Sequence, residues 1–213
     1  MLKDTATALA TAEYLLDIEA VKFSPEDYFT WASGWYSPIY CDNRLTLSHP
    51  HIRTFLAESM TKIIENNETK PDVIAGVATG AIAIGMLVAQ MLGLPFVYVR
   101  PEAKKHGRRN QIEGQLPENA KVVVIEDLIS TGGSSLAAVE ALREAGADVL
   151  YMAAIMTYGF EVASDNFAVA DLRLITLCEY DVLIQKAIEK GYVKEDDVEL
   201  LRQWRKSPST WKK

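Results

Sequence analysis

The sequence predicts an α/β fold with a mainly parallel sheet flanked by helices and a small N-terminal hood. From residue 73 onward, short uncharged apolar runs alternate with amphipathic stretches. Gly93 and Gly146 stand where two of the amphipathic stretches end, as expected for helix C-termini. Strands that alternate with helices are joined by right-handed crossovers, which favour a parallel sheet with helices on both faces. The first 65 residues lack this alternation.

The N-terminal hood is expected to contain two helices separated by an irregular segment. The first helix covers residues 5–19, and its apolar face consists of Leu9, Ala12, Leu15 and Leu16. Aromatic residues and turn formers then predict short antiparallel strands and loops. A second helix is expected to be capped by Ser48, with Pro50 in its first turn. We therefore divide one structural domain into a hood, residues 1–65, and an α/β core, residues 66–213.

The core is expected to consist of strands and helices that largely alternate along the chain. The expected strands are 73–77, 96–100, 121–125, 149–157 and 172–177. The expected helices are 81–92, 134–145, 180–190 and 196–205. Residues 101–120 are polar and basic and show no apolar periodicity.

Composition excludes several classes of protein. A chain of 213 residues with 49% apolar and 24% charged residues is typical of a globular protein. The net charge of −7 argues against a nucleic-acid binder. Cys41 and Cys178 lie far apart without a CxxC pattern, which predicts a reducing, cytoplasmic location. Residues 73–99 carry no charge and are long enough to span a bilayer, but glycines and Pro95 divide them. A buried strand–helix–strand unit has the same hydropathy, so we predict no membrane association.

One segment, residues 122–135, combines features that together suit a sugar phosphate. An apolar strand leads into Glu126 and Asp127, two apolar residues follow, and a Ser-Thr-Gly-Gly-Ser loop then opens a helix. Small residues at a helix N-terminus allow backbone N–H groups and hydroxyls to bind a phosphate. Two neighbouring carboxylates accept hydrogen bonds from vicinal hydroxyls. The pattern therefore predicts a site for ribose 5-phosphate at the carboxyl edge of the sheet.

Other phosphate motifs fit this segment poorly. A Walker A loop requires a lysine after the glycines, and a dinucleotide fingerprint requires GxGxxG without two intervening acids. A capped helix after a buried strand, with both acids merely solvated, is the structural alternative.

Residues 122–135 resemble the motif with which type I phosphoribosyltransferases bind 5-phosphoribosyl-1-pyrophosphate (PRPP). The blocks SGWYSPIYCDNR, GVATGAIAIG and YVRPEAKKHG extend the resemblance to the orotate phosphoribosyltransferases. The resemblance implies the type I phosphoribosyltransferase fold and Mg2+-dependent transfer of the 5-phosphoribosyl group from PRPP to N1 of orotate. It also implies Mg2+ held mainly through PRPP, with no direct protein ligand. Two alternatives are a purine phosphoribosyltransferase and a non-catalytic PRPP-sensing regulator.

The basic stretch at 100–109 holds five cations and a histidine. A solvated surface loop has the same composition, but a loop that expels pyrophosphate also needs movable cations. By resemblance this loop closes over PRPP and reaches across a homodimer interface, with Lys104 and His106 as catalytic residues. The chain has Pro101 where some relatives carry another lysine, a charge that Lys105 supplies. The PRPP-binding residues implied are Arg100, Lys104, Lys105, His106, Glu126, Asp127, Leu128, Ile129, Ser130, Thr131, Gly132, Gly133 and Ser134.

The acceptor side rests on residues 33–42 and on Ser130. By resemblance Tyr40 and Ser130 bind orotate, and Tyr40 suits stacking on a flat heterocycle. Tyr40 and Trp31 are equally well interpreted as core or interface aromatics. Some relatives carry a lysine where this chain has Ala32, and others an arginine in the segment that reads TYGFE here. Thr79 and Gly80 match the family's pyrophosphate loop, although Gly80 is also interpretable as the start of a helix.

Overall fold

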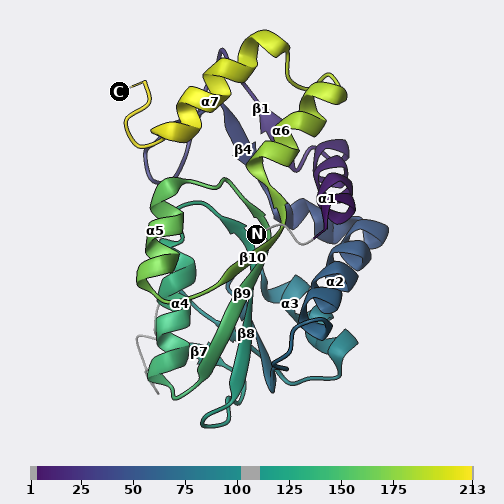
Figure 1. The fold of residues 1–213 in the computed structure, drawn as a ribbon, viewed down its shortest axis with the longest axis vertical. Coiled ribbons are helices and arrows are strands. Elements are labelled where there is room, and N and C mark those ends of the chain that lie inside the picture. The colour runs from purple at the N-terminus through teal and green to yellow at the C-terminus, as the bar shows by residue number, and fades with distance from the viewer. Residues whose placement is uncertain (1–3, 102–110, 213) are drawn as a thin grey trace.

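A computed structural model describes residues 4–101 and 111–212 of the chain (Figure 1). The described residues form one six-stranded sheet and two small two-stranded sheets. The order across the large sheet is β10 (Leu174–Glu179), β9 (Asp148–Thr157), β8 (Lys121–Ile129), β5 (Val73–Val77), β6 (Phe96–Val99) and β7 (Ile112–Glu113). Only the β6–β7 pair is antiparallel among these described strands. The predicted mainly parallel α/β fold is therefore confirmed.

Helices cover both faces of the large sheet. On one face lie α1 (Thr5–Asp17), α2 (Pro50–Glu65) and α3 (Ile82–Leu92), and on the other lie α4 (Gly133–Glu144) and α5 (Glu161–Val169) (Figure 1). Strand β5 is buried along its whole length, which explains why residues 73–77 carry no charge. Helix α3 ends at Gly93, which adopts φ +66°, as the glycine pattern predicts. No helix in the described part of the chain is long and apolar enough to cross a membrane.

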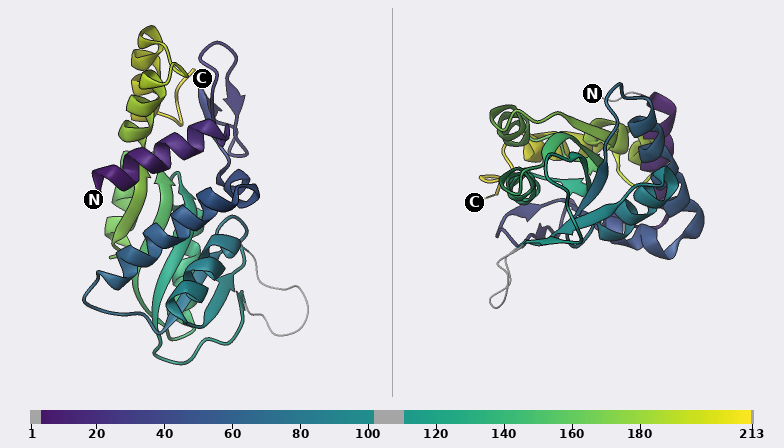
Figure 2. Two further views of the ribbon diagram at one scale, coloured as in Figure 1. Left: turned by 90° about the vertical axis from the view of Figure 1, so that its right-hand side faces the viewer. Right: turned by 90° about the horizontal axis from the view of Figure 1, so that it is seen from below.

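Residues 20–48, here called the N-terminal segment, lie at the carboxyl end of the sheet, beside the C-terminal helices. Its strands pair antiparallel, β1 (Val21–Phe23) with β4 (Ile39–Cys41) and β2 (Phe29–Thr30) with β3 (Tyr36–Ser37). The short 3-10 helix η1 (Asn43–Ser48) follows β4. Beside them stand α6 (Tyr180–Glu189), the 3-10 turn η2 (Glu195–Asp197) and α7 (Val198–Lys206), at the same end of the molecule in Figure 1 and in the left view of Figure 2. The predicted short antiparallel strands are confirmed.

An aromatic cluster joins this N-terminal segment to the rest of the molecule. Trp31 lies 5.1 Å from Tyr158 and 5.6 Å from Trp204 between ring centroids, and Phe160 lies 5.3 Å from Trp204. Trp204 is fully buried, and its indole N–H donates to the carbonyl of Tyr36. Because α1 also packs on α6 and β10, residues on both sides of position 65 share one buried core. The division of the chain at that position stays a prediction.

The structure differs from the sequence-based expectations at several elements. Strand β8 continues to Ile129, whereas the pattern predicted an end at Ile125, because β9 pairs with it up to Ile129. Helix α5 and the short strand β7 were not predicted. Helix α2 begins after His49, without a side-chain cap, because Ser48 ends η1 instead of capping α2.

Candidate active site

The paired acids lie within the last part of β8, where the strand has a neighbour on only one side. The register with β5 ends where Gly76 faces Ile125, whereas the register with β9 continues to Ile129 opposite Thr157. Strand β5 ends at Val77, so residues 126–129 extend beyond its pairing with β8. The carboxyl edge of the sheet is thus stepped between β5 and β8, which is the kind of crevice where open α/β folds bind ligands.

Glu126 is a buried carboxylate with both oxygens engaged. Its Oε1 accepts a hydrogen bond from the backbone N–H of Asp127 at 3.0 Å, and its Oε2 accepts one from Ser135 Oγ at 2.7 Å. The residue is only 5% exposed. Burial raises the pKa of Glu126 well above its usual value, and the neighbouring Asp127 charge raises this pKa further. Glu126 is therefore held rigidly at the start of the site.

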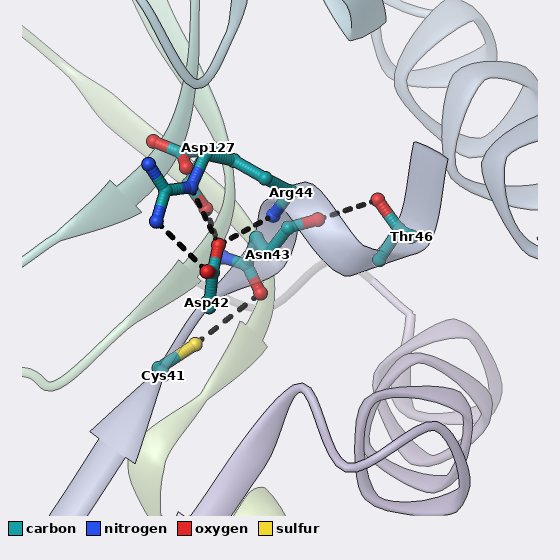
Figure 3. A network of polar contacts seen from close by, with 6 residues as sticks. All are labelled: Cys41, Asp42, Asn43, Arg44, Thr46 and Asp127. Atoms are coloured by element: carbon teal, nitrogen blue, oxygen red, sulfur yellow. Dashed lines mark hydrogen bonds and ion pairs between the residues drawn. The ribbon is translucent and has the colours of Figure 1, made fainter. Parts of the chain in front are cut away.

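Asp127 is more open, and its carboxylate lies against Gly80. A Cβ atom built on Gly80 would come within 2.2 Å of Asp127 Oδ2, so a glycine is required there. Burial raises the pKa of Asp127, while hydrogen bonds and the positive charge of Arg44 lower it. The backbone carbonyl of Asp127 accepts a hydrogen bond of 2.6 Å from Asn43 Nδ2 (Figure 3). Asp127 is thus contacted from both the α3 side and the N-terminal segment.

The loop of small residues that follows β8 is held from outside by α5 and the end of β9. Asn166 Nδ2 donates to the carbonyl of Thr131 at 2.9 Å, and the N–H of Tyr158 donates to the carbonyl of Ile129 at 3.1 Å. Gly132 caps α4 with φ +80°, and a Cβ there would lie 2.8 Å from the Phe167 ring. Gly133 and Ser134 are exposed at the helix N-terminus, where the first N–H groups have no partner within the helix.

Residues 78–80 form the turn between β5 and α3. The Ala78–Thr79 peptide bond is cis, and Thr79 is exposed. Helix α3 begins at Ile82 with Ala81 as its N-cap, so Gly80 precedes the helix instead of starting it. This turn lies beside Asp127, on the side of β8 that β5 leaves open.

Four residues of the basic stretch at 100–109 were predicted to bind PRPP, and the structure describes one of them, Arg100. Arg100 follows β6, its N–H donates to the carbonyl of Gln111, and its guanidinium lies 3.6 Å from Glu113. Lys104, Lys105 and His106 lie outside the described residues.

Tyr40 and Trp31, the two aromatic residues considered for the acceptor side, lie in different environments. Tyr40 is 40% exposed, and its ring centroid lies 5.6 Å from that of Phe29. Trp31 belongs to the aromatic cluster described above, and its indole N–H donates to the carbonyl of Ile39. Of the two interpretations of Trp31, the structural one is confirmed, and Tyr40 remains available at the surface.

Three residues near this edge were not singled out from the sequence: Asn43, Arg44 and Asn166. Asn43 is almost fully buried, and Asp42 binds Arg44 through two parallel hydrogen bonds (Figure 3). Asn43 and Arg44 stand inside the quoted block SGWYSPIYCDNR, but the contact from Asn43 to Asp127 spans 84 residues. Asn166 belongs to α5, the helix that was not predicted. No local pattern signals such long-range contacts.

Among the described residues, no group of three or more His, Cys, Asp or Glu side chains could hold a metal ion. Asp127 nevertheless places its carboxylate oxygens against the turn at residues 78–80, and carboxylate and phosphate oxygens are the ligands that Mg2+ prefers.

Comparison with known proteins identifies the family. Residues 47–173 match the phosphoribosyl transferase domain model. An orotate phosphoribosyltransferase from Porphyromonas gingivalis is 55% identical over 94% of this chain and 95% of its own length. The crystal structure of orotate phosphoribosyltransferase from Aeropyrum pernix superposes with a TM-score of 0.73 at 28% identity, covering 85% of this chain and 98% of that one. UMP synthase from Leishmania donovani gives a TM-score of 0.77 at 26% identity over 92% of this chain, which covers 42% of that longer protein. The chain adopts the type I phosphoribosyltransferase fold and belongs to the orotate phosphoribosyltransferase family.

Proposed function

We propose that this chain transfers the 5-phosphoribosyl group from PRPP to N1 of orotate, giving orotidine 5′-monophosphate and pyrophosphate. One observation carries the proposal: β8 brings Glu126 and Asp127 to the open edge of the sheet, directly before a small-residue loop and a helix N-terminus. The family of the chain supplies the expected acceptor, since its curated relatives are named for orotate.

The 5′-phosphate of PRPP binds the loop Ser130-Thr131-Gly132-Gly133-Ser134. Backbone N–H groups at the start of α4, the hydroxyls of the loop and the positive end of the helix dipole all favour a dianion. The contact from Asn166 to the Thr131 carbonyl supports this assignment, because it holds the loop in shape before the ligand arrives. Leu128 and Ile129 contribute backbone at the base of the loop.

The ribose diol binds the paired acids. Asp127 accepts directly, while Glu126, whose oxygens each already hold one hydrogen bond, has one further lone pair on each oxygen to offer. Asp127 and the Thr79–Gly80 turn would lie beside a Mg2+ ion that is held mainly through PRPP, with no direct protein ligand required. When bound, the ion neutralises charge on the departing pyrophosphate.

The basic loop completes the donor site. Lys104 and His106 act on the leaving pyrophosphate as catalytic residues, and Arg100 and Lys105 add positive charge. Arg100 exchanges its 3.6 Å ion pair with Glu113 for the pyrophosphate when PRPP binds. We further propose that the active form is a homodimer in which each loop serves the neighbouring subunit's site, and that the enzyme works in the cytoplasm, where both cysteines stay reduced.

The reaction proceeds by positioning and charge. The C1–O bond to pyrophosphate breaks, C1 acquires oxocarbenium character, and N1 of orotate attacks from the opposite face with inversion. Ser130 and Tyr40 hold the orotate. No protein nucleophile takes part: Cys41 and Cys178 are buried free thiols, and burial raises both pKa values, that of Cys178 to about 12.

A turnover assay with PRPP and Mg2+ tests the proposal. Orotate is expected to be consumed far faster than uracil, adenine or xanthine. Lys104→Ala is expected to lower kcat by about 100-fold or more while the variant stays folded. Lys121→Ala, which removes an exposed lysine at the opposite end of β8, serves as the matched control. Preference for a purine base would reject the acceptor, and near-normal turnover by Lys104→Ala would reject the role of the loop.

A further inference from the structure

The carboxylate of the acceptor lacks an obvious partner in this chain. Orotate differs from uracil by a carboxylate on C6, the ring atom next to the nucleophilic N1. An anion that enters a closed site requires charged or hydrogen-bonding partners. At the two positions where other family members carry a cation, this chain has Ala32 and a TYGFE segment whose Tyr158 is buried in the aromatic cluster. A partner for the carboxylate, such as another cation, must therefore come from elsewhere in the site.

Chemistry restricts where that cation lies. During transfer, N1 of the acceptor is within bonding distance of C1 of the ribose, so the C6 carboxylate lies close to the sugar. Under the proposed function, the sugar hydroxyls contact Asp127. The partner of the carboxylate is thus expected near Asp127 and near Tyr40, on the N-terminal side of the site.

Arg44 meets both conditions. It stands in the first turn of η1, directly after Asn43, whose side chain binds the backbone of Asp127 at 2.6 Å. Tyr40 stands four residues before Arg44, in β4. The hydrogen-bonded Asp42 carboxylate raises the pKa of Arg44 most, and the charges of Tyr40 and Asp127 raise it further. Figure 3 shows the Arg44 guanidinium on the Asp127 side of η1.

The orientation of Arg44 is set before any ligand binds. Asp42 Oδ1 accepts from Arg44 Nε at 2.6 Å and from the Arg44 backbone N–H at 3.1 Å, and Asp42 Oδ2 accepts from Nη2 at 2.8 Å. This contact uses one edge of the guanidinium. Within the described part of the chain, Nη1 has no hydrogen-bond partner, and the side chain is 58% exposed. The second edge of the guanidinium therefore presents the fork of N–H donors that matches a carboxylate.

We propose that Arg44 determines the specificity for a carboxylated acceptor by binding the C6 carboxylate through Nη1 and Nη2, with Asp42 as its positioning residue. This inference rests on the proposed function. It explains how a chain with Ala32 and Tyr158 at the other positions still recognises an anionic pyrimidine.

Lys22 is the other cation between residues 20 and 48, and it provides the matched control. It faces Tyr40 across the β1–β4 pair, is 53% exposed and lies 3.4 Å from Glu19. Arg44 adjoins Asn43, which contacts Asp127, whereas neither sequence neighbour of Lys22 has a described hydrogen bond to residues 126–134. Lys22→Gln also removes one positive charge from residues 20–48, but from β1 instead of η1.

The test compares two nucleotides that differ only in the carboxylate, orotidine 5′-monophosphate and uridine 5′-monophosphate, by calorimetry on the full-length protein. The unaltered enzyme is expected to prefer the carboxylated nucleotide. Arg44→Gln should weaken binding of that nucleotide by about 10- to 100-fold and leave the uridine nucleotide nearly unchanged, because one charge-assisted fork is lost. Arg44→Lys should restore part of the difference, and Lys22→Gln should behave like the unaltered chain.

Steady-state kinetics supply the second measurement. Arg44→Gln should raise KM for orotate and leave KM for PRPP unchanged, and Asp42→Asn should do the same to a smaller extent. An equal loss for both nucleotides, or no loss, would overturn the assignment of Arg44. Failure of the unaltered enzyme to use orotate at all would instead reject the proposed function, so the two failures are distinguishable.

Discussion

The side-chain amide of Asn43 donates a hydrogen bond of 2.6 Å to the backbone carbonyl of Asp127, across 84 residues of sequence. Asn43 is 2% exposed, its own carbonyl accepts from Thr46 Oγ1, and its Oδ1 accepts from the thiol of Cys41 (Figure 3). This contact attaches the N-terminal segment to the paired acids of β8. The segment predicted to bind the acceptor and the strand end predicted to bind PRPP are therefore in direct contact.

Replacing Asn43 is expected to affect both stability and PRPP binding. Asn43→Ala leaves the Asp127 carbonyl without its partner in a buried setting, which costs about 1–3 kcal/mol in the free energy of unfolding. Because the backbone of Asp127 then loosens, KM for PRPP should rise. Urea denaturation and initial rates measure the two effects. Asn67→Ala is the control, because it removes a hydrogen bond of 2.6 Å from the side-chain amide of Asn67 to the carbonyl of Ile63 near the end of α2. This variant should lower stability without changing KM for PRPP.

The buried carboxylate of Glu126 predicts a specific pH dependence of stability. Its pKa is raised on folding, chiefly by burial, so the folded state binds the proton more tightly than the unfolded state. The stabilisation is complete below the unfolded-state pKa of about 4.3 and is lost as pH rises towards the folded-state pKa. Glu126→Gln should therefore show a flatter profile of unfolding free energy than the unaltered chain as pH rises above about 4.3. Parallel profiles from denaturant titrations at several pH values would contradict the raised pKa.

Gly80 is expected to tolerate no side chain. The Cβ of Gly80→Ala would lie 2.2 Å from Asp127 Oδ2 and 2.4 Å from its Cγ, so the carboxylate must move. A displacement of this kind costs about 100-fold in turnover. Gly85→Ala is the matched control, because its Cβ would meet the Phe96 ring at 2.9 Å, away from Asp127. The control should lower the melting temperature yet keep its KM for PRPP, whereas Gly80→Ala should lose PRPP binding in calorimetry.

Asn166 is expected to affect the affinity for PRPP through the loop at residues 130–134, which is proposed to bind the 5′-phosphate. Asn166→Ala removes the 2.9 Å hydrogen bond to the carbonyl of Thr131. A looser loop must be ordered when the ligand binds, so KM for PRPP should rise by about 3- to 10-fold with little change in kcat. Asn66→Ala, at an exposed position after α2, should leave both parameters unchanged. A fall in kcat alone would show that Asn166 does not act through phosphate binding.

The local sequence was sufficient to predict helices that are buried along one face and strands in which several consecutive residues are buried. Residues 73–77 were predicted as a buried strand because every side chain in β5 is covered, and residues 81–92 were predicted as a helix that a glycine ends. The donor motif was predictable for the same reason: strand, acids, small-residue loop and helix are contiguous, so their spacing alone brings them to one edge of the sheet.

Elements that depend on distant partners were not predictable from local sequence. Strand β8 extends to Ile129 only because β9 is long enough to pair with it, and α5 buries little beyond Ala163 and Phe167. The contacts of Asn43 with Asp127 and of Asn166 with Thr131 join segments far apart in the chain. Hydrophobic periodicity and turn chemistry act over a few residues, whereas these contacts exist only after the sheet and its covering segments have packed together.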